Sequence, residues 1–151
     1  MDVTISGKRK DTFKMVHHGQ NSIVDSIKLC AKQKNIRKGF CIHNDLLQCG
    51  LLEDIYVNSA LICMYMSCEE ITKAQELLEE LPVRYVISWN ALISGYVQQG
   101  RGQDAMTCFD DMQRDGLSPD PITFTCILKA CGNMGSINKG IQIHEEIMYR
   151  G

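Results

Sequence analysis

The chain has 151 residues, of which 44% are hydrophobic and 23% charged, and its formal net charge at pH 7 is −2. This apolar content argues against disorder over most of the length, and the slight negative charge gives no general attraction for nucleic acid. Charged residues interrupt the longest apolar stretches well before the roughly 18 residues that a membrane-spanning helix needs. The composition therefore predicts a globular protein that does not contact a membrane.

Residues 1–19 differ from the rest of the chain. They contain the basic run 8–10 and two adjacent histidines, and no apolar period passes through them. We interpret this segment as a frayed N-terminal leader outside the repeats. It is a poor match to a transit peptide, because it is short and contains Asp2 and Asp11, whereas such peptides avoid acidic residues.

The sequence from residue 20 onward repeats itself. Residues 20–50 align with residues 121–151 at an offset of 101 positions without a gap, with eight identities in 31 positions. A second similarity, at an offset of 31, relates residues 60–74 to residues 91–105. The intervals are thus 35, 31 and 35 residues, and periods of this length are typical of helical-repeat architectures. The identical pairs at the longer offset are Lys28/Lys129, Cys30/Cys131, Ile36/Ile137, Lys38/Lys139, Gly39/Gly140, Ile42/Ile143, His43/His144 and Gly50/Gly151.

Each unit has the pattern of a helix, a short turn and a second helix. An apolar stripe with the spacing of an amphipathic helix runs from Trp89 to Val97 and ends at Gly100. A second helix is expected from about Gln103 to Arg114, followed by Gly116 as the stop signal.

The last unit follows the same pattern. Ser136 is a plausible N-cap, as is Asn35 at the matching position. Beyond Ser136, one stripe is expected to form a packing face, in which the small Gly140 allows a neighbouring helix to approach. Because the chain ends inside this unit, we expect the last helix to leave an apolar side uncovered. The stripe consists of Ile137, Gly140, Ile141, His144, Ile147 and Met148.

No segment shows the alternation of a strand flanked by hairpin turns. The predicted fold is therefore all-α, an α-solenoid of stacked antiparallel helical hairpins that forms a right-handed superhelix. The eight cysteines contain no C-x-x-C pair and sit mostly among apolar residues, so we expect reduced core thiols, without disulfides or a metal site.

The motifs resemble those of the pentatricopeptide repeat family. The run 88–96 (SWNALISGY), followed by Ala105, Phe109, Met112 and the closing residues 119–120, is similar to its standard repeat. The alternating unit lengths resemble the plant subclass in which long, short and standard repeats follow one another. The repeats implied are 20–54 (long), 55–85 (short), 86–120 (standard) and 121–151 (long, truncated).

This resemblance implies single-stranded RNA binding in a mitochondrion or chloroplast, for RNA editing or processing, together with other editing or processing factors and without DNA. In such arrays each repeat faces one base. The family reads the base with the fifth and last residues of a repeat, while the second residue packs against it. In the standard repeat these are Asn90, Asp120 and Ile87, and Asn with Asp is the family's combination for uracil.

The other repeats depart from that pattern. The short repeat has Ser59 at its fifth position but Tyr85 at its last, where an acid is usual. The first long repeat pairs Val24 with Asp54, and valine cannot form a hydrogen bond with a base. The last repeat offers Thr125, but its closing residue would lie beyond the end of the sequence. Sequence selectivity of this chain alone should therefore be slight.

Several features have simpler interpretations. Trp89, Tyr96 and Phe109 are expected in the core rather than stacked on bases, and His43 and His144 are expected in packing rather than in catalysis. We expect no enzymatic activity and no cofactor, because the ligand spacing of a zinc deaminase is missing. Two alternatives to RNA binding remain open: a protein-interaction scaffold with a helical-repeat groove, and an inactive repeat fragment.

Overall fold

A computed structural model describes residues 22–150, so the expected leader at residues 1–19 lies outside the described residues. The described chain forms eight helices without a strand and divides into two units, at the step from Val83 to Arg84. Each unit holds two helical hairpins. The predicted all-α, helical-repeat fold is confirmed. No helix among residues 22–150 combines the length and apolarity that crossing a membrane would take.

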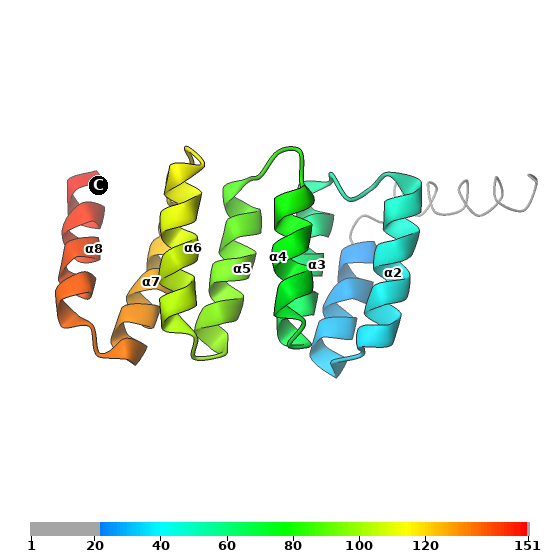
Figure 1. Cartoon of the computed structure of the whole chain (residues 1–151), viewed down its shortest axis with the longest axis horizontal. Coiled ribbons are helices and arrows are strands. Elements are labelled where there is room, and N and C mark those ends of the chain that lie inside the picture. The colour runs from blue at the N-terminus through cyan, green and yellow to red at the C-terminus, as the bar shows by residue number, and fades with distance from the viewer. Residues whose placement is uncertain (1–21, 151) are drawn as a thin grey trace, which may run out of the picture. The chain divides into compact units, whose positions relative to one another are not determined.

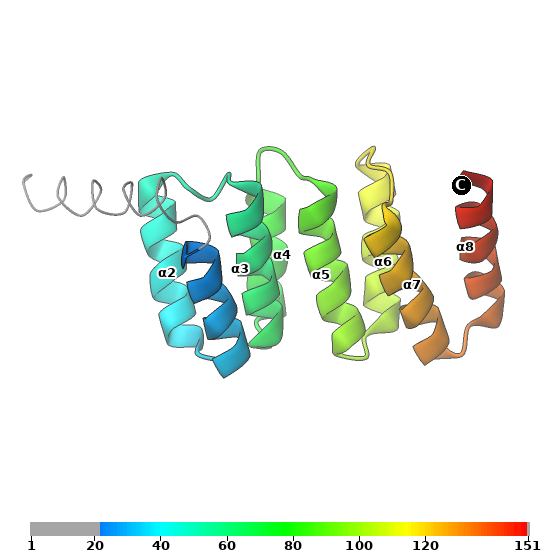
Figure 2. The same cartoon turned by 180° about the vertical axis from the view of Figure 1, so that it is seen from behind.

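The first unit contains the helix at residues 22–33, followed by α2 (Ile36–Cys49), α3 (Ile55–Ser67) and α4 (Ile71–Glu80). Helices α2 and α4 lie on one side of this unit, and the helix at 22–33 lies with α3 on the other (Figures 1 and 2). We call the leading helix of each hairpin its first helix and the following one its second helix. In this unit the second helices are α2 and α4.

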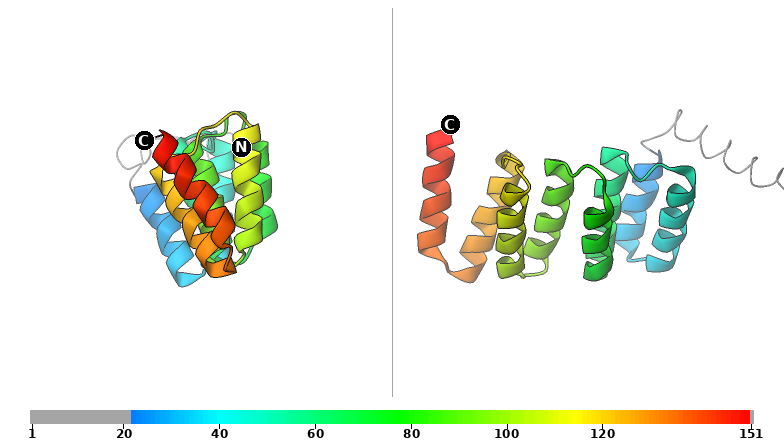
Figure 3. Two further views of the ribbon diagram at one scale, coloured as in Figure 1. Left: turned by 90° about the vertical axis from the view of Figure 1, so that its left-hand side faces the viewer. Right: turned by 45° about the horizontal axis from the view of Figure 1, so that its top comes forward.

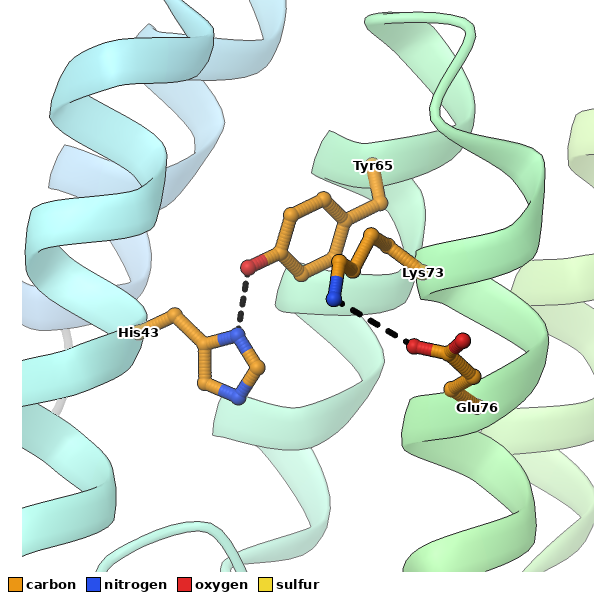
Figure 4. A network of polar contacts seen from close by, with 4 residues as sticks. All are labelled: His43, Tyr65, Lys73 and Glu76. Atoms are coloured by element: carbon orange, nitrogen blue, oxygen red, sulfur yellow. Dashed lines mark hydrogen bonds and ion pairs between the residues drawn. The ribbon is translucent and has the colours of Figure 1, made fainter.

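The contact between α2 and α3 is close and includes a polar pair. The imidazole Nδ1 of His43 on α2 is hydrogen-bonded to the hydroxyl of Tyr65 on α3 (Figure 4). The ring of Phe40 lies 5.6 Å from that of Tyr65. Gly39 lies directly beneath Met64, since a Cβ built on Gly39 would be 2.6 Å from the sulfur. The α2 face formed by Gly39, Phe40 and His43 therefore fits the Met64–Tyr65 pair of α3.

The second unit contains α5 (Val86–Gln98), α6 (Gly102–Arg114), α7 (Pro121–Met134) and α8 (Ile137–Arg150). Here α5 and α7 are the first helices, and α7 packs against α5, α6 and α8. A short turn joins α7 to α8 at one end of the pair (Figure 3, right). Trp89, Tyr96 and Phe109 are at most 7% exposed, so their expected place in the core is confirmed.

The turn inside each hairpin contains one residue in the left-handed backbone region. These residues are Lys34, Glu69, Gly100 and Gly135, with φ values of 52°, 64°, 71° and 66°. They are 35, 31 and 35 positions apart, the same intervals that separate the repeated sequence motifs. Glycine adopts this conformation without the steric penalty that a side chain brings. The two early hairpins nevertheless use Lys34 and Glu69, so the turn geometry is imposed by the packed helices.

Three expectations were wrong in detail. Helix α5 is buried on nearly all sides rather than along one stripe, because it packs against both α6 and α7. On α8 the buried residue is Ile143, whereas Ile137 and Met148 of the expected packing stripe are 75% and 70% exposed and His144 is exposed. Gly140 of the same stripe lies beside α7, since a Cβ built on Gly140 would be 3.7 Å from the Cβ of Cys131.

The cysteines are also less uniform than expected. All eight are free. Cys30, Cys108 and Cys131 are buried, but Cys41 and Cys63 are exposed. Apolar neighbours in the sequence did not reveal which side of a helix each thiol occupies.

Candidate nucleic-acid interface

A polar network joins the N-terminus of α7 to the first half of α5. The Oδ1 atom of Asp120, the residue before α7, accepts a hydrogen bond from the backbone N–H of Thr123 at 2.9 Å. The backbone N–H of Asp120 donates to the Thr123 hydroxyl at 3.2 Å, which completes a capping box. Asn90 on α5 donates from Nδ2 to Asp120 Oδ1 at 2.9 Å, and its Oδ1 accepts from the Thr123 hydroxyl at 2.5 Å. Asn90 and Asp120, which were expected to lie together, are thus in direct contact.

This network fixes the orientation of the Asn90 amide. An ionised carboxylate can only accept hydrogen bonds, so the nitrogen of the amide faces Asp120 and the oxygen faces Thr123. One Nδ2 hydrogen and one Oδ1 lone pair remain for another partner. Asn90 is only 6% exposed, so only a small part of this edge is accessible to a partner. A donor beside an acceptor is complementary to the edge of a pyrimidine base.

Thr123 was not anticipated from the sequence. It is completely buried and touches both Asn90 and Asp120. The spacing of Asp120 and Thr123 is that of an N-cap and the third helical residue, but the usual capping box has Glu or Gln at that third position.

The network also controls the ionisation of Asp120. Burial alone would raise the pKa of this carboxyl group. Hydrogen bonds from the backbone of Thr123, the amide of Asn90, the hydroxyl of Thr123 and the backbone of Ile122 outweigh burial, and they hold the pKa of Asp120 below its usual value. The carboxylate therefore remains charged at neutral pH.

The lowered pKa of Asp120 predicts acid sensitivity. Its ionised form stabilises the fold above the unfolded-chain pKa of about 3.9, and this contribution is lost as the pH falls from there through the lower folded-state pKa. We expect Asp120→Asn to be less stable than the unmodified chain at pH 7, with a difference that shrinks as the pH falls below about 4. Urea unfolding between pH 7 and pH 2 measures this. A difference that stays constant across that range would contradict it.

Apolar side chains accompany the network on the same surface. Ile87 precedes Asn90 by three residues, which places both on one face of α5. Ile87 is 36% exposed, and Ile122, at the matching position of α7, is 60% exposed. The surface around the amide therefore offers exposed aliphatic groups against which a planar base could pack.

The other candidate residues are arranged differently. The Ser59 hydroxyl donates to the carbonyl of Ile55 in its own helix at 2.6 Å, and Ser59 is 7% exposed. Thr125 is exposed, but its hydroxyl likewise donates within its own helix, to Pro121 O at 2.8 Å. Among the described residues, Asn90 is the one candidate reading residue whose side chain is held by the helix of the next repeat.

Asp54 is the first long repeat's counterpart of Asp120. It caps α3 by accepting from the backbone N–H groups of Tyr56 and Val57, each at 3.0 Å. Val57 stands where Thr123 stands in α7, and Val24 stands where Asn90 stands in α5. The first unit therefore has the helix cap but lacks the side chains that complete the network.

The acids are concentrated on the second helices, which also carry six basic residues, Arg37, Lys38, Lys73, Arg114, Lys139 and Arg150. The first helices, at 22–33, α3, α5 and α7, carry three lysines and a single acid, Asp25. The lysines are Lys28, Lys32 and Lys129, and all three are exposed. The net charge of −2 therefore conceals first helices that are locally basic. The acids of the second helices are Asp45, Glu76, Glu79, Glu80, Asp104, Asp110, Asp111, Glu145 and Glu146.

The histidine, cysteine and acidic side chains of the described residues are spread out. No cluster of three histidine, cysteine or acidic side chains within residues 22–150 could hold a metal ion. His43 is engaged with Tyr65, and His144 lies exposed on α8.

Family models match the second half of the chain. The PPR repeat family matches residues 84–133, and the PPR repeat matches residues 122–151. These two ranges together contain all of the Asn90–Asp120–Thr123 network.

Plant proteins show similarity over most of the chain. A mitochondrial pentatricopeptide repeat-containing protein of Arabidopsis thaliana is 32% identical over 126 residues, which is 83% of this chain and 18% of that protein. A chloroplastic one from the same plant is 34% identical over 132 residues, 87% of this chain and 16% of that protein. The chain thus spans less than a fifth of the length of these relatives.

Among solved structures, the pentatricopeptide repeat protein PPR10 in complex with an 18-nt psaJ RNA element has a similar fold. The TM-score is 0.73 at 21% identity, and the match covers 94% of this chain and 22% of that one. A second structure, of PPR10 from maize, gives a TM-score of 0.65 at 20% identity and covers 93% of this chain and 21% of that one.

Proposed function

Because residues 84–151 carry repeats of the pentatricopeptide repeat family, we propose that the chain binds single-stranded RNA along its first helices. The observation that carries this proposal is the oriented amide of Asn90, held by Asp120 and Thr123 with one donor and one acceptor unused. In this proposal Asn90 reads a uracil and Asp120 holds the reading amide. Ile87 packs against the base, while Ser59 and Thr125 contribute little selectivity.

The charge distribution favours RNA over a protein ligand. Phosphate groups are attracted by lysines and repelled by acids. The first helices carry three lysines and one acid, whereas the second helices carry nine acids and six basic residues. Lys28 and Lys129 occupy equivalent positions, each one helical turn beyond a reading position, at Val24 and Thr125. A strand whose bases face the reading positions would bring its phosphates near these ammonium groups.

We extend the proposal to the repeats and to the cellular process. Helices begin at Ile55, Val86 and Pro121, which supports repeats at 20–54, 55–85, 86–120 and 121–151 of the long, short, standard and long types. Relatives named mitochondrial and chloroplastic support action in an organelle. RNA editing or processing is the proposed process, in which the chain supplies binding and other factors supply chemistry.

The test is base-selective binding that depends on Asn90. Short RNAs differing only at the base facing the standard repeat are titrated against the unmodified chain and Asn90→Ala. We expect the substitution to lower affinity for uracil by about tenfold or less, a loss of up to about 1.4 kcal/mol, and to change affinity for guanine little. Ser59→Ala is the matched control, since its hydroxyl is already bonded to its own helix.

Thermal melts of each variant separate lost binding from lost folding, because Asn90 also links two helices. Equal affinity of the unmodified chain for all four bases would refute the reading role. Absence of RNA binding at low salt would refute the function itself and favour the protein-interaction scaffold.

A further inference from the structure

Thr123 carries a hydroxyl that the bond from its backbone to the helix cap does not require. Asp54 caps α3 by accepting from the backbone N–H of Val57 at 3.0 Å. Asp120 accepts the equivalent bond from the backbone N–H of Thr123 at 2.9 Å. Valine has no hydroxyl, so the cap of α3 shows that this bond forms without one. The hydroxyl of Thr123 is therefore available to the neighbouring Asn90.

The Thr123 hydroxyl has one proton, and the groups around it decide which oxygen receives that proton. Asn90 Oδ1 lies 2.5 Å from the hydroxyl oxygen, and Asp120 Oδ1 lies 2.9 Å from it. Asp120 Oδ1 already accepts from Asn90 Nδ2 and from the backbone N–H of Thr123. The proton therefore goes to Asn90 Oδ1, while the hydroxyl oxygen accepts from the backbone N–H of Asp120 at 3.2 Å.

The amide of Asn90 is thus held at both ends. Asp120 binds its nitrogen at 2.9 Å, and Thr123 binds its oxygen. Thr123 is itself completely buried, and its hydroxyl is bonded to the backbone of the cap. With the bond to Asp120 alone, the amide would be free to pivot about its nitrogen. The hydroxyl therefore fixes the direction in which the remaining donor and acceptor of the amide point.

We infer that Thr123 is a positioning residue that determines how strictly the standard repeat distinguishes uracil from cytosine. The inference rests on the proposed base-reading role of Asn90. Uracil presents its ring N–H between two carbonyl oxygens, whereas cytosine presents an unprotonated ring nitrogen beside an amino group. Both bases can pair with an amide, but they require its donor and acceptor in different places. An amide held at both ends therefore fits one base better, and an amide that pivots accommodates both.

Thr123→Val tests the inference, because it removes the hydroxyl and keeps the branched shape, and Val57 shows that the cap accepts valine. Fluorescence anisotropy gives the affinities for two RNAs that differ only by uracil or cytosine at the base facing the standard repeat. The ratio of uracil affinity to cytosine affinity should fall by about threefold to fivefold, the usual effect of one hydrogen bond. Thr123→Ser keeps the hydroxyl and should keep the ratio.

Thr107→Val is the matched control. Thr107 is exposed on α6, and its hydroxyl donates within that helix to the carbonyl of Gln103 at 3.1 Å. The same hydroxyl-to-methyl change at this position should leave the ratio as it is in the unmodified chain. Thermal melts check that all three variants are folded.

NMR relaxation of the unmodified chain without RNA gives a second test, which does not depend on the folding of any variant at position 123. The order parameter of Asn90 Nδ2 should be close to about 0.85, the value of a rigid backbone. A value below about 0.6 would overturn the inference, because the amide would then pivot in spite of Thr123.

The binding results also separate this inference from the proposed function. If the unmodified chain prefers uracil and Thr123→Val keeps the ratio, or lowers both affinities equally, the inference is wrong and the reading role of Asn90 stands. If the unmodified chain binds all four bases equally, the reading role fails and this inference fails with it.

Discussion

Replacing Tyr65 by alanine should lower the free energy of unfolding by about 3–5 kcal/mol, the usual loss when a large aromatic side chain is removed from a core. Tyr65 is completely buried between α2 and α3, where its ring packs on Phe40 and its hydroxyl binds His43. The substitution removes the ring, leaves a cavity and deprives the half-buried imidazole of its partner. Urea unfolding followed by circular dichroism measures the change.

The contribution of the Tyr65–His43 hydrogen bond can be measured apart from that of the Tyr65 ring. Tyr65→Phe keeps the ring and should cost only about 1–2 kcal/mol, because it leaves His43 without a partner. Tyr149→Ala is a matched control, since Tyr149 is 95% exposed and its loss should change stability by less than about 0.5 kcal/mol. If Tyr65→Ala cost no more than Tyr149→Ala, the contact of α2 with α3 would not contribute to stability.

The pKa shifts of His43 and Tyr65 favour a hydrogen bond between two uncharged side chains. Burial lowers the pKa of His43, with Glu80 opposing that shift and Lys73 adding to it. Burial, together with nearby Glu70 and Cys68, raises the pKa of Tyr65 to about 12. At neutral pH the tyrosine therefore keeps its proton and the imidazole is uncharged, so the hydroxyl can donate to Nδ1.

Replacing both Lys28 and Lys129 by glutamine should weaken RNA binding by about 60-fold at 50 mM salt and about tenfold at 200 mM. Two phosphate contacts on a single strand correspond to a slope of about −1.4 in a plot of log affinity against log salt concentration. Removing the two lysines should therefore reduce the magnitude of this slope by about 1.4. Binding isotherms at four salt concentrations give both the affinity and the slope.

The control for this prediction is the double variant Lys73→Gln and Lys139→Gln. It removes the same charge from second helices, where Lys73 is paired with Glu76 at 3.4 Å. If RNA lies along the first helices, this variant should keep the slope of the unmodified chain. An equal loss in both double variants would mean that the lysines act only through net charge.

The repeat pattern predicted the helices well, because each hairpin must bury an apolar side against the next. The helix at 103–114 was placed within one residue of α6, and Asn35 caps α2 as expected by accepting from the backbone N–H of Lys38 at 3.2 Å. Sequence spacing could not show that α5 is buried almost all round, since this depends on having helices on two sides.

Side-chain partnerships were predicted less completely. The contact of Asn90 with Asp120 followed from the family resemblance, but Thr123 was missed because the usual capping box has Glu or Gln, not threonine, at the third helical position. The identical histidines, His43 and His144, were expected to behave alike. They differ because the Tyr65 hydroxyl on α3 binds His43, while His144 lies exposed on α8.

The capping box at the start of α7 limits how this repeat can change during evolution or redesign. Asp120 both caps α7 and holds Asn90. Most substitutions at position 120 would therefore remove a helix cap worth about 0.5–2 kcal/mol, in addition to any change that they make in base preference. Only asparagine, serine and threonine would keep a capping oxygen at that position. Position 90 caps no helix, so a substitution there changes the reading side chain without removing a cap. New base preferences should therefore arise first at position 90, with position 120 changing only within a small set of capping residues.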